Sequence, residues 1–136
     1  MQVSDRTDVT PGDAADAAAP VIDRECMAEM WEDAGPALFR RMAQLFVQER
    51  QRYVAHLHAA LRSGSREDLK REAHSLKSAA AYICAERLRL ASLRLERAAP
   101  TAQPALLARI VAMIEAEADI ADIELARAVA EKGGAG

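Results

Sequence analysis

Hydrophobic residues recur every three or four positions along most of this chain, the spacing typical of amphipathic helices. The clearest run extends from Arg66 to Ile83. Its apolar stripe contains Leu69, Ala73, Leu76, Ala80 and Ile83. At about 100° per residue, His74 lies roughly 140° from the centre of this stripe. We therefore expect the imidazole to face water.

The same period predicts helices on both sides of this run. A short helix extends from Asp23, its N-cap, to about Asp33. A long helix begins at Gly35-Pro36, because proline is tolerated in a first turn, and continues to about Arg62. Their expected core positions are Cys26, Met27, Met30 and Trp31 in the first, and Leu38, Phe39, Met42, Leu45, Phe46, Tyr53, Leu57 and Leu61 in the second.

Ser65, with Asp68 three residues later, is typical of a helix start after the Ser63-Gly64 turn. A shift in apolar phase predicts a break near Cys84, followed by a helix from about Ala85 to Ala98. Pro100 and Pro104 mark the next turn. A last helix is expected from about Pro104 to Glu131.

Four long amphipathic helices joined by short turns predict an all-α fold, an up-down-up-down four-helix bundle with a short extra N-terminal helix as a lid. Residues 1–20 lack a sustained apolar period and are interpreted as a disordered N-terminal tail. Residues 21–132 would form the bundle, and residues 133–136 a frayed C-terminus.

Composition narrows the classes of function. Aromatic residues make up only 4% of the chain, which favours helices over a sheet. A net charge of −3 argues against nucleic acid as the main partner. No apolar run approaches the roughly 20 residues of a membrane span, and no signal-peptide pattern is present. Cys26 and Cys84 form no disulfide framework, so we expect two buried thiols in a reducing cytoplasm.

The surroundings of His74 suit an anionic group. Lys77 follows it by one helical turn and Lys70 precedes it by one turn. Neutral imidazole is a competent nucleophile near pH 7, and a phosphoryl group on it would lie close to both ammonium groups. Ser75, Ser78 and Ala81 on the same face are small enough to let a partner approach closely.

This stretch resembles the histidine phosphotransfer (HPt) domains of bacterial phosphorelays, whose signature is Ala-His-x-Leu-Lys-Gly within a four-helix bundle. Ala73-His74-Ser75-Leu76-Lys77 matches the signature, and Leu88 to Glu96 resembles the Leu-rich helix with its Leu-Glu ending. The likeness covers about Pro36 to Ala99. Ser78 and Cys84 depart from it, since the family usually has glycine at the first position and commonly at the second.

The resemblance implies that His74 accepts a phosphoryl group and that Lys77 stabilises it. It also implies a receiver domain as partner, which supplies both the phospho-aspartate and Mg²⁺, so that no cofactor belongs to this chain. Lys70, Arg71, Ser75, Ser78 and Ala81 are the expected docking face. Residues 66–97 hold eight basic and five acidic residues, a balance that suits an acidic receiver surface.

The expected function is therefore that of a monomeric, cytoplasmic phosphocarrier that works reversibly between two receivers. No nucleotide-binding glycine-rich loop occurs, which argues against direct use of ATP. Drainage of phosphate from a receiver is an equally open direction of flow.

Two rival functions are a non-catalytic helical adaptor and the dimeric phosphoacceptor module of a sensor kinase. The kinase module typically has an acidic residue directly after its histidine, where this chain has Ser75. His56 and His58 lie two residues apart on different sides of a helix and are interpreted as surface or rim residues rather than metal ligands.

Overall fold

The computed structural model describes residues 13–135, and these residues form six α-helices and no strand. In chain order the helices are α1 (Asp13–Ala18), α2 (Arg24–Ala34), α3 (Pro36–Ser63), α4 (Arg66–Tyr82), α5 (Glu86–Ala98) and α6 (Pro104–Ala135). None of the described helices is long and apolar enough to cross a membrane.

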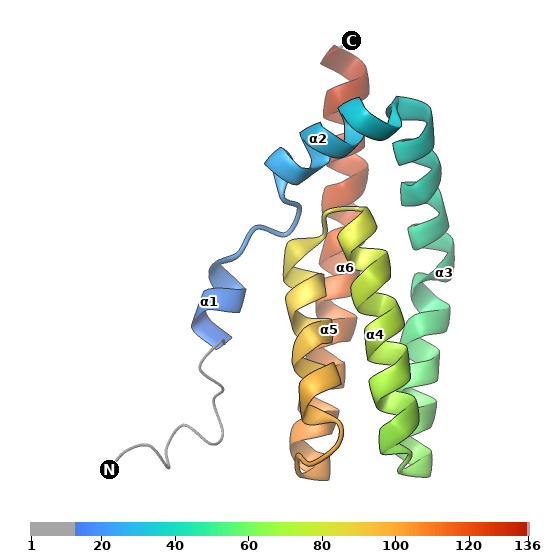
Figure 1. Ribbon diagram of the computed structural model, residues 1–136, viewed down its shortest axis with the longest axis vertical. Coiled ribbons are helices and arrows are strands. Elements are labelled where there is room, and N and C mark those ends of the chain that lie inside the picture. The colour runs from blue at the N-terminus through green and yellow to red at the C-terminus, as the bar shows by residue number, and fades with distance from the viewer. Residues whose placement is uncertain (1–12, 136) are drawn as a thin grey trace.

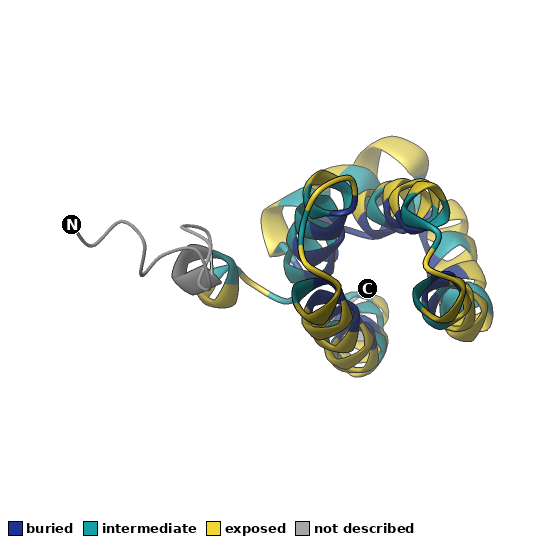
Figure 2. Cartoon of the chain, turned by 90° about the horizontal axis from the view of Figure 1, so that it is seen from below, coloured by how far each residue is buried: buried dark blue, intermediate teal, exposed yellow. Residues whose placement is uncertain are grey.

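Helices α3, α4, α5 and α6 run alternately up and down side by side, which confirms the predicted bundle (Figure 1). Seen along the bundle, buried positions face inward on all four helices (Figure 2). Helix α2 crosses the end of the bundle between the upper parts of α6 and α3, as the expected lid does (Figure 1).

The helix boundaries follow from local capping. The Asp23 carboxylate accepts hydrogen bonds from the backbone N–H groups of Glu25 and Cys26, both at 3.1 Å, at the start of α2. Gly64, with φ of 70°, ends α3 by donating its N–H to the carbonyls of Ala60 and Leu61. The Ser65 hydroxyl then accepts the N–H of Asp68 at 3.1 Å, so the predicted N-cap of α4 is confirmed.

The core is made mainly of small and aliphatic side chains from the four bundle helices, together with two phenylalanines of α3, Met27 of α2 and Ile83 of the turn after α4. Its largest fully buried members are Phe39, Met27, Leu57, Leu69, Leu76, Ile83, Leu88, Leu95, Ile110, Ile114, Leu125 and Val111. On α4 the predicted stripe is buried as a whole. Burial of this stripe fixes the rotation of α4 about its axis and therefore decides which residues it presents to solvent.

Two expected core residues of α3 lie at the surface. Leu38 is 50% exposed and Leu45 is 47% exposed, so the prediction was wrong for both. Helix α3 has 28 residues but its neighbour α4 only 17. The N-terminal part of α3 therefore extends past the end of α4 (Figure 1). At that end Leu45 borders a hollow with Ala79 and Tyr82 of α4 instead of filling the core.

The predicted tail is helical between residues 13 and 18, while residues 1–12 lie outside the described part of the chain. Six residues form no stable helix by themselves. Here Arg94 donates to the Asp16 carboxylate at 2.6 Å, and Arg87 donates to the carbonyl of Ala17 at 3.3 Å. Two arginines of α5 thus hold α1 against the bundle. The hydrophobic period along the chain cannot predict such a contact, because its two sides are far apart in sequence.

The C-terminal helix is longer than expected. It continues to Ala135 through the glycines that were predicted to fray, and Gly136 lies outside the described residues. Arg40 of α3 packs against the α6 backbone at Gly133, where a Cβ atom would come within 2.8 Å of its guanidinium.

The two cysteines are joined in a disulfide, which corrects the expectation of two separate thiols. They are 58 residues apart in sequence, and their Cα atoms lie 5.8 Å apart. The bond connects α2 to the turn between α4 and α5. The two cysteines meet because α2 crosses the end of the bundle at which this turn lies (Figure 1).

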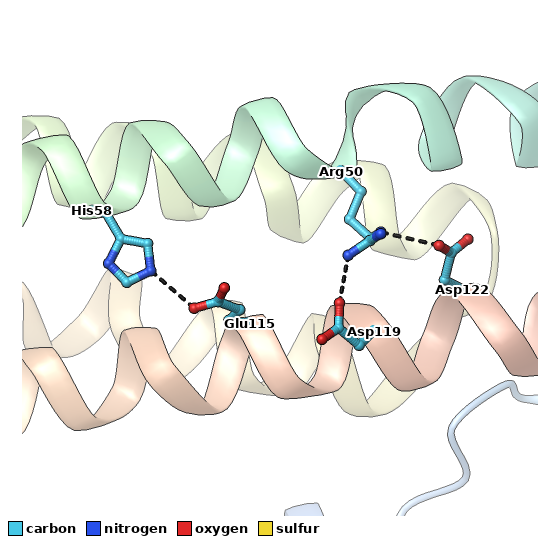
Figure 3. Close-up of polar contacts among 5 residues, drawn as sticks. All are labelled: Arg50, His58, Glu115, Asp119 and Asp122. Atoms are coloured by element: carbon cyan, nitrogen blue, oxygen red, sulfur yellow. Dashed lines mark hydrogen bonds and ion pairs between the residues drawn. The ribbon is translucent and has the colours of Figure 1, made fainter.

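A row of ion pairs joins α3 to α6 (Figure 3). Arg50 contacts Asp119 at 2.5 Å and Asp122 at 3.1 Å. Farther along, His58 Nε2 lies 2.9 Å from Glu115 Oε1. These contacts connect α3 and α6, the first and last helices of the bundle, which are neighbours in space but are not consecutive in the chain.

Candidate functional site

His74 lies in the middle of α4 with 61% of its side chain exposed. Its neighbours Ala73 and Leu76 are 0% and 1% exposed and pack in the core. Because they hold the opposite face of the helix against the bundle, His74 faces solvent. The orientation predicted from the helical period is therefore confirmed.

A carboxylate from the neighbouring helix meets this histidine. His74 Nδ1 lies 2.8 Å from Glu96 Oε2, and the Glu96 side chain is only 17% exposed. Lys77 Nζ donates to the other carboxylate oxygen, Oε1, at 2.6 Å. Glu96 thus links the predicted nucleophile on α4 to the predicted phosphate-stabilising lysine one turn later.

The two cationic or polar partners hold the pKa of Glu96 below its ordinary value. The hydrogen bond from Lys77 is the largest cause, and the bond with His74 adds to it, while partial burial acts in the opposite direction. Glu96 is therefore an ionised carboxylate at neutral pH. An ionised carboxylate can only accept hydrogen bonds, so the imidazole proton resides on Nδ1.

This tautomer has a direct chemical consequence. With the proton held at Nδ1, the lone pair of the neutral ring is on Nε2, and the ring of His74 is largely exposed. A nitrogen in this state attacks an electrophile without first losing a proton. The positive charge that then develops on the ring is next to the Glu96 carboxylate, which stabilises it.

The residues expected to form a docking face surround His74 on α4. Lys70, Ser75, Ser78 and Ala81 are all exposed. Arg71 is exposed too, and it forms an ion pair with Asp68 one turn back on the same helix. Lys70 has no hydrogen bond or ion pair among the described residues, so its ammonium group stays available to an incoming anion.

The end of this face is apolar. Tyr82 is 61% exposed and, with Ala79, lines a hollow between α4 and α3. Leu45 and Met42 form the α3 side of the hollow. The surface beyond Ser78 therefore offers apolar contact to a partner, next to the small residues that allow close approach.

Glu96 was not among the predicted site residues, although it is the glutamate of the Leu-Glu pair that ends the run from Leu88. A signal was available in the register of the helix pair. His74 and Glu96 are each 11 residues from Ala85, which lies in the turn. In an antiparallel hairpin of helices, positions equidistant from the turn lie side by side.

His56 and His58 lie outside this site. His56 Nδ1 is 3.4 Å from Glu72 on α4, whereas His58 pairs with Glu115 on α6 (Figure 3). They point to different helices, as their spacing predicted. Within the described part of the chain, no group of three or more histidine, cysteine, aspartate or glutamate side chains is arranged to hold a metal ion.

Comparisons with known proteins agree with the geometry. The model of the Hpt domain family matches residues 41–120. The fold is similar to the crystal structure of histidine-containing phosphotransfer protein B (HptB) from Pseudomonas aeruginosa PAO1, with a TM-score of 0.71 and 25% identity. That match covers 84% of this chain and 98% of the HptB chain. No curated protein sequence matches the chain.

Proposed function

Since this chain belongs to the Hpt domain family and is a histidine phosphotransfer protein, we propose that His74 is its phosphoryl acceptor. In the proposed reaction, His74 takes a phosphoryl group from the aspartyl phosphate of one receiver domain and passes it to the aspartate of another. The transfer is reversible. The observation that carries this assignment is the contact between His74 Nδ1 and Glu96 on an otherwise exposed helix face.

The proposed step balances without an added proton donor. His74 Nε2 attacks phosphorus, the bond between phosphorus and the aspartate oxygen breaks, and the aspartate leaves as a carboxylate. The ring keeps its proton on Nδ1 and becomes positively charged, and Glu96 stabilises this charge. In the reverse direction, the same carboxylate holds the ring in position as the phosphoryl group departs.

Lys77 and Lys70 are proposed to stabilise the phosphoryl oxygens. An ammonium group has three N–H donors, and Lys77 uses one of them on Glu96, which leaves the others for phosphate. Lys70 is one turn before His74 and exposed. Attraction between unit charges at ~4 Å is about 1 kcal/mol in water and grows when docking excludes solvent.

The receiver is proposed to supply Mg²⁺ and the acyl phosphate, and this chain is proposed to have no cofactor and no kinase activity of its own. The docking face would comprise Lys70, Arg71, Ser75, Ser78 and Ala81. We expect a monomer, because a carrier has to leave one partner before it engages the next. We expect it in the cytoplasm, because the phosphoryl groups of receivers derive from ATP.

Phosphoryl transfer tests this function directly. The protein is incubated with Mg²⁺ and radiolabelled phosphorylated receivers from the same genome, and label is followed on the wild type and on His74→Gln. Acid-labile, base-stable label on the wild type alone is the expected result. Folded protein that receives no label from any receiver would contradict the proposal and leave the binding adaptor as the better account.

A further inference from the structure

Helix α2 contacts α3 and α6 through Trp31 and Arg24, and its start is also linked to the turn between α4 and α5. Cys26 in α2 is disulfide-bonded to Cys84, which lies between α4 and α5. One residue before α2, the N–H of Asp23 donates to the carbonyl of Cys84 at 2.8 Å. The covalent bond and this hydrogen bond thus both hold the start of α2 to the same residue of the turn.

The backbone of Cys84 is unusual for a residue with a side chain. Its φ is 60°, in the left-handed region, and among the described residues only Gly35 and Gly64 share a positive φ. A Cβ atom is disfavoured there, so glycine is the residue that the turn itself would favour. Unlike glycine, Cys84 can form a disulfide with Cys26, and this bond connects the turn to α2.

We propose that Cys26 and Cys84 form a thiol–disulfide exchange site that controls how firmly the α4–α5 turn and the neighbouring docking face are held. This inference rests on the proposed phosphotransfer function. In the cytoplasm proposed for it, protein disulfides are mostly transient and redox-sensing. The co-reactants are therefore a low-molecular-weight thiol or a protein dithiol in one direction and their disulfides in the other.

Exchange at this site balances as follows. A thiolate attacks one sulfur of the pair and forms a mixed disulfide, and the other cysteine leaves as a thiolate and takes up a proton. A second thiol releases the remaining cysteine. The pair thus gains two electrons and two protons while two thiols become one disulfide. Cys26 is half-buried and Cys84 is 3% exposed, which makes the Cys26 sulfur the more accessible point of attack.

Reduction is expected to loosen α2 rather than to unfold the bundle. Met27 of α2 is 1% exposed and the preceding Ile22 is 5% exposed, so both keep their core contacts without the disulfide. The change is expected at the turn itself. Ile83 and Tyr82, directly before Cys84, line the hollow beside the docking face. His74 is ten residues before Cys84, and its contact with Glu96 does not involve the disulfide.

Redox state should therefore change docking without changing the chemistry of His74. The full chain is equilibrated in glutathione buffers of increasing reducing strength, and its free thiols are titrated. In the same samples we would measure amide exchange of residues 22–34 and 83–85, labelling of His74 by phosphoramidate, and the dissociation constant for the receiver that gives transfer to His74. Phosphoramidate needs no docking surface.

On reduction, we expect faster amide exchange in both segments and roughly fivefold weaker receiver binding, because docking must then order the turn again. Phosphoramidate labelling should stay the same. Cys26→Ser and Cys84→Gly should both behave like the reduced wild type and ignore the buffer. Cys84→Gly removes the disulfide and also the steric cost of a side chain at φ of 60°, whereas Cys26→Ser removes the disulfide alone. Comparing the two variants therefore separates loss of the bond from strain in the turn.

Three results would overturn the exchange site: no disulfide in any glutathione buffer, a disulfide that reduces without a change in amide exchange, or equal receiver affinity in both redox states. Loss of phosphoramidate labelling in both states would instead contradict the role of His74. The thiol titration and the amide exchange would still decide the redox inference in that case.

Discussion

His74 on α4 and Glu96 on α5 lie the same distance along the chain from Ala85, and their side chains meet with 2.8 Å between Nδ1 and Oε2. The turn between the two helices therefore sets the register of the site. A carboxylate at this position orients the ring and fixes its tautomer, and it would offset the positive charge that the proposed transfer places on the ring.

Replacing Glu96 by Gln should slow phosphoryl transfer to His74 about tenfold, because the amide keeps the shape of the side chain but loses the negative charge next to the ring. The measurement is the single-turnover rate of transfer from a phosphorylated receiver. Glu86→Gln is the matched control on the same helix, since Glu86 pairs with Arg89 and lies outside the site. Equal rates for the two variants would argue against a positioning role for Glu96.

Stability should fall when pH drops below the ordinary carboxyl range. The pKa of Glu96 is lowered chiefly by Lys77, and that of Asp68 chiefly by Arg71 and then by Ser65. A carboxyl group with a lowered pKa in the folded state binds protons more readily when unfolded. Its contribution is complete above its unfolded pKa and is lost as pH falls through the folded pKa.

Urea unfolding at a series of pH values measures this dependence. The double variant Glu96→Gln with Asp68→Asn should show a flatter decline of the free energy of unfolding between neutral and acidic pH than the wild type does. A decline of unchanged steepness would show that other carboxylates are responsible for the acid sensitivity.

Arg50 should contribute more to the free energy of unfolding than its neighbour Arg52 does. Its side chain is 19% exposed and it contacts both Asp119 and Asp122 (Figure 3). Arg50→Met leaves two carboxylates without their partner and should cost about 1–2 kcal/mol of unfolding free energy. Arg52→Met, at a 51% exposed side chain that pairs with Glu49 on the same helix, should cost clearly less, because water screens an exposed ion pair. Chemical denaturation of both variants compares the costs, and similar values would count against the α3–α6 ion pairs as a stabilising contact.

Breaking the disulfide should lower the free energy of unfolding. A disulfide between residues 58 positions apart lowers the conformational entropy of the unfolded chain. In the chain-entropy model this loss stabilises the folded state by about 4 kcal/mol. Urea unfolding with and without dithiothreitol, with free thiols titrated in parallel, measures the difference. The Cys26→Ser variant should not respond to the reductant. An unchanged midpoint for fully reduced wild type would show that the bond adds no stability.

A bulky charge on the docking face should block a receiver without disturbing the fold. Ala81 is exposed on α4 near the hollow lined by Tyr82. Ala81→Arg should reduce receiver affinity about tenfold or more by steric exclusion, with unchanged helicity. Ala116→Arg makes the same substitution at an exposed position of α6 and serves as the control. Receiver binding that tolerates Ala81→Arg would place the interface elsewhere.

Patterns within single helices were read correctly from the sequence. The N-caps Asp23 and Ser65, the break at Cys84 and the outward orientation of His74 all depend on residues within a few positions of each other. Predictions failed where a distant element decides the outcome. Leu38 and Leu45 fit the apolar period of α3 but remain exposed, because α3 extends past the end of α4 and Leu45 only borders the hollow at that end.

The amino-acid sequence by itself thus determined α2 and the four bundle helices, the N-caps of α2 and α4, and the face on which His74 lies, because these follow from spacing along one helix and from hydrogen bonds between residues close in the chain. Only the tertiary structure decided that Glu96 orients His74, that Arg94 anchors α1 and that Cys26 meets Cys84. Each of these contacts joins residues 22 or more positions apart, and the way the helices pack, which no local pattern encodes, brings them together.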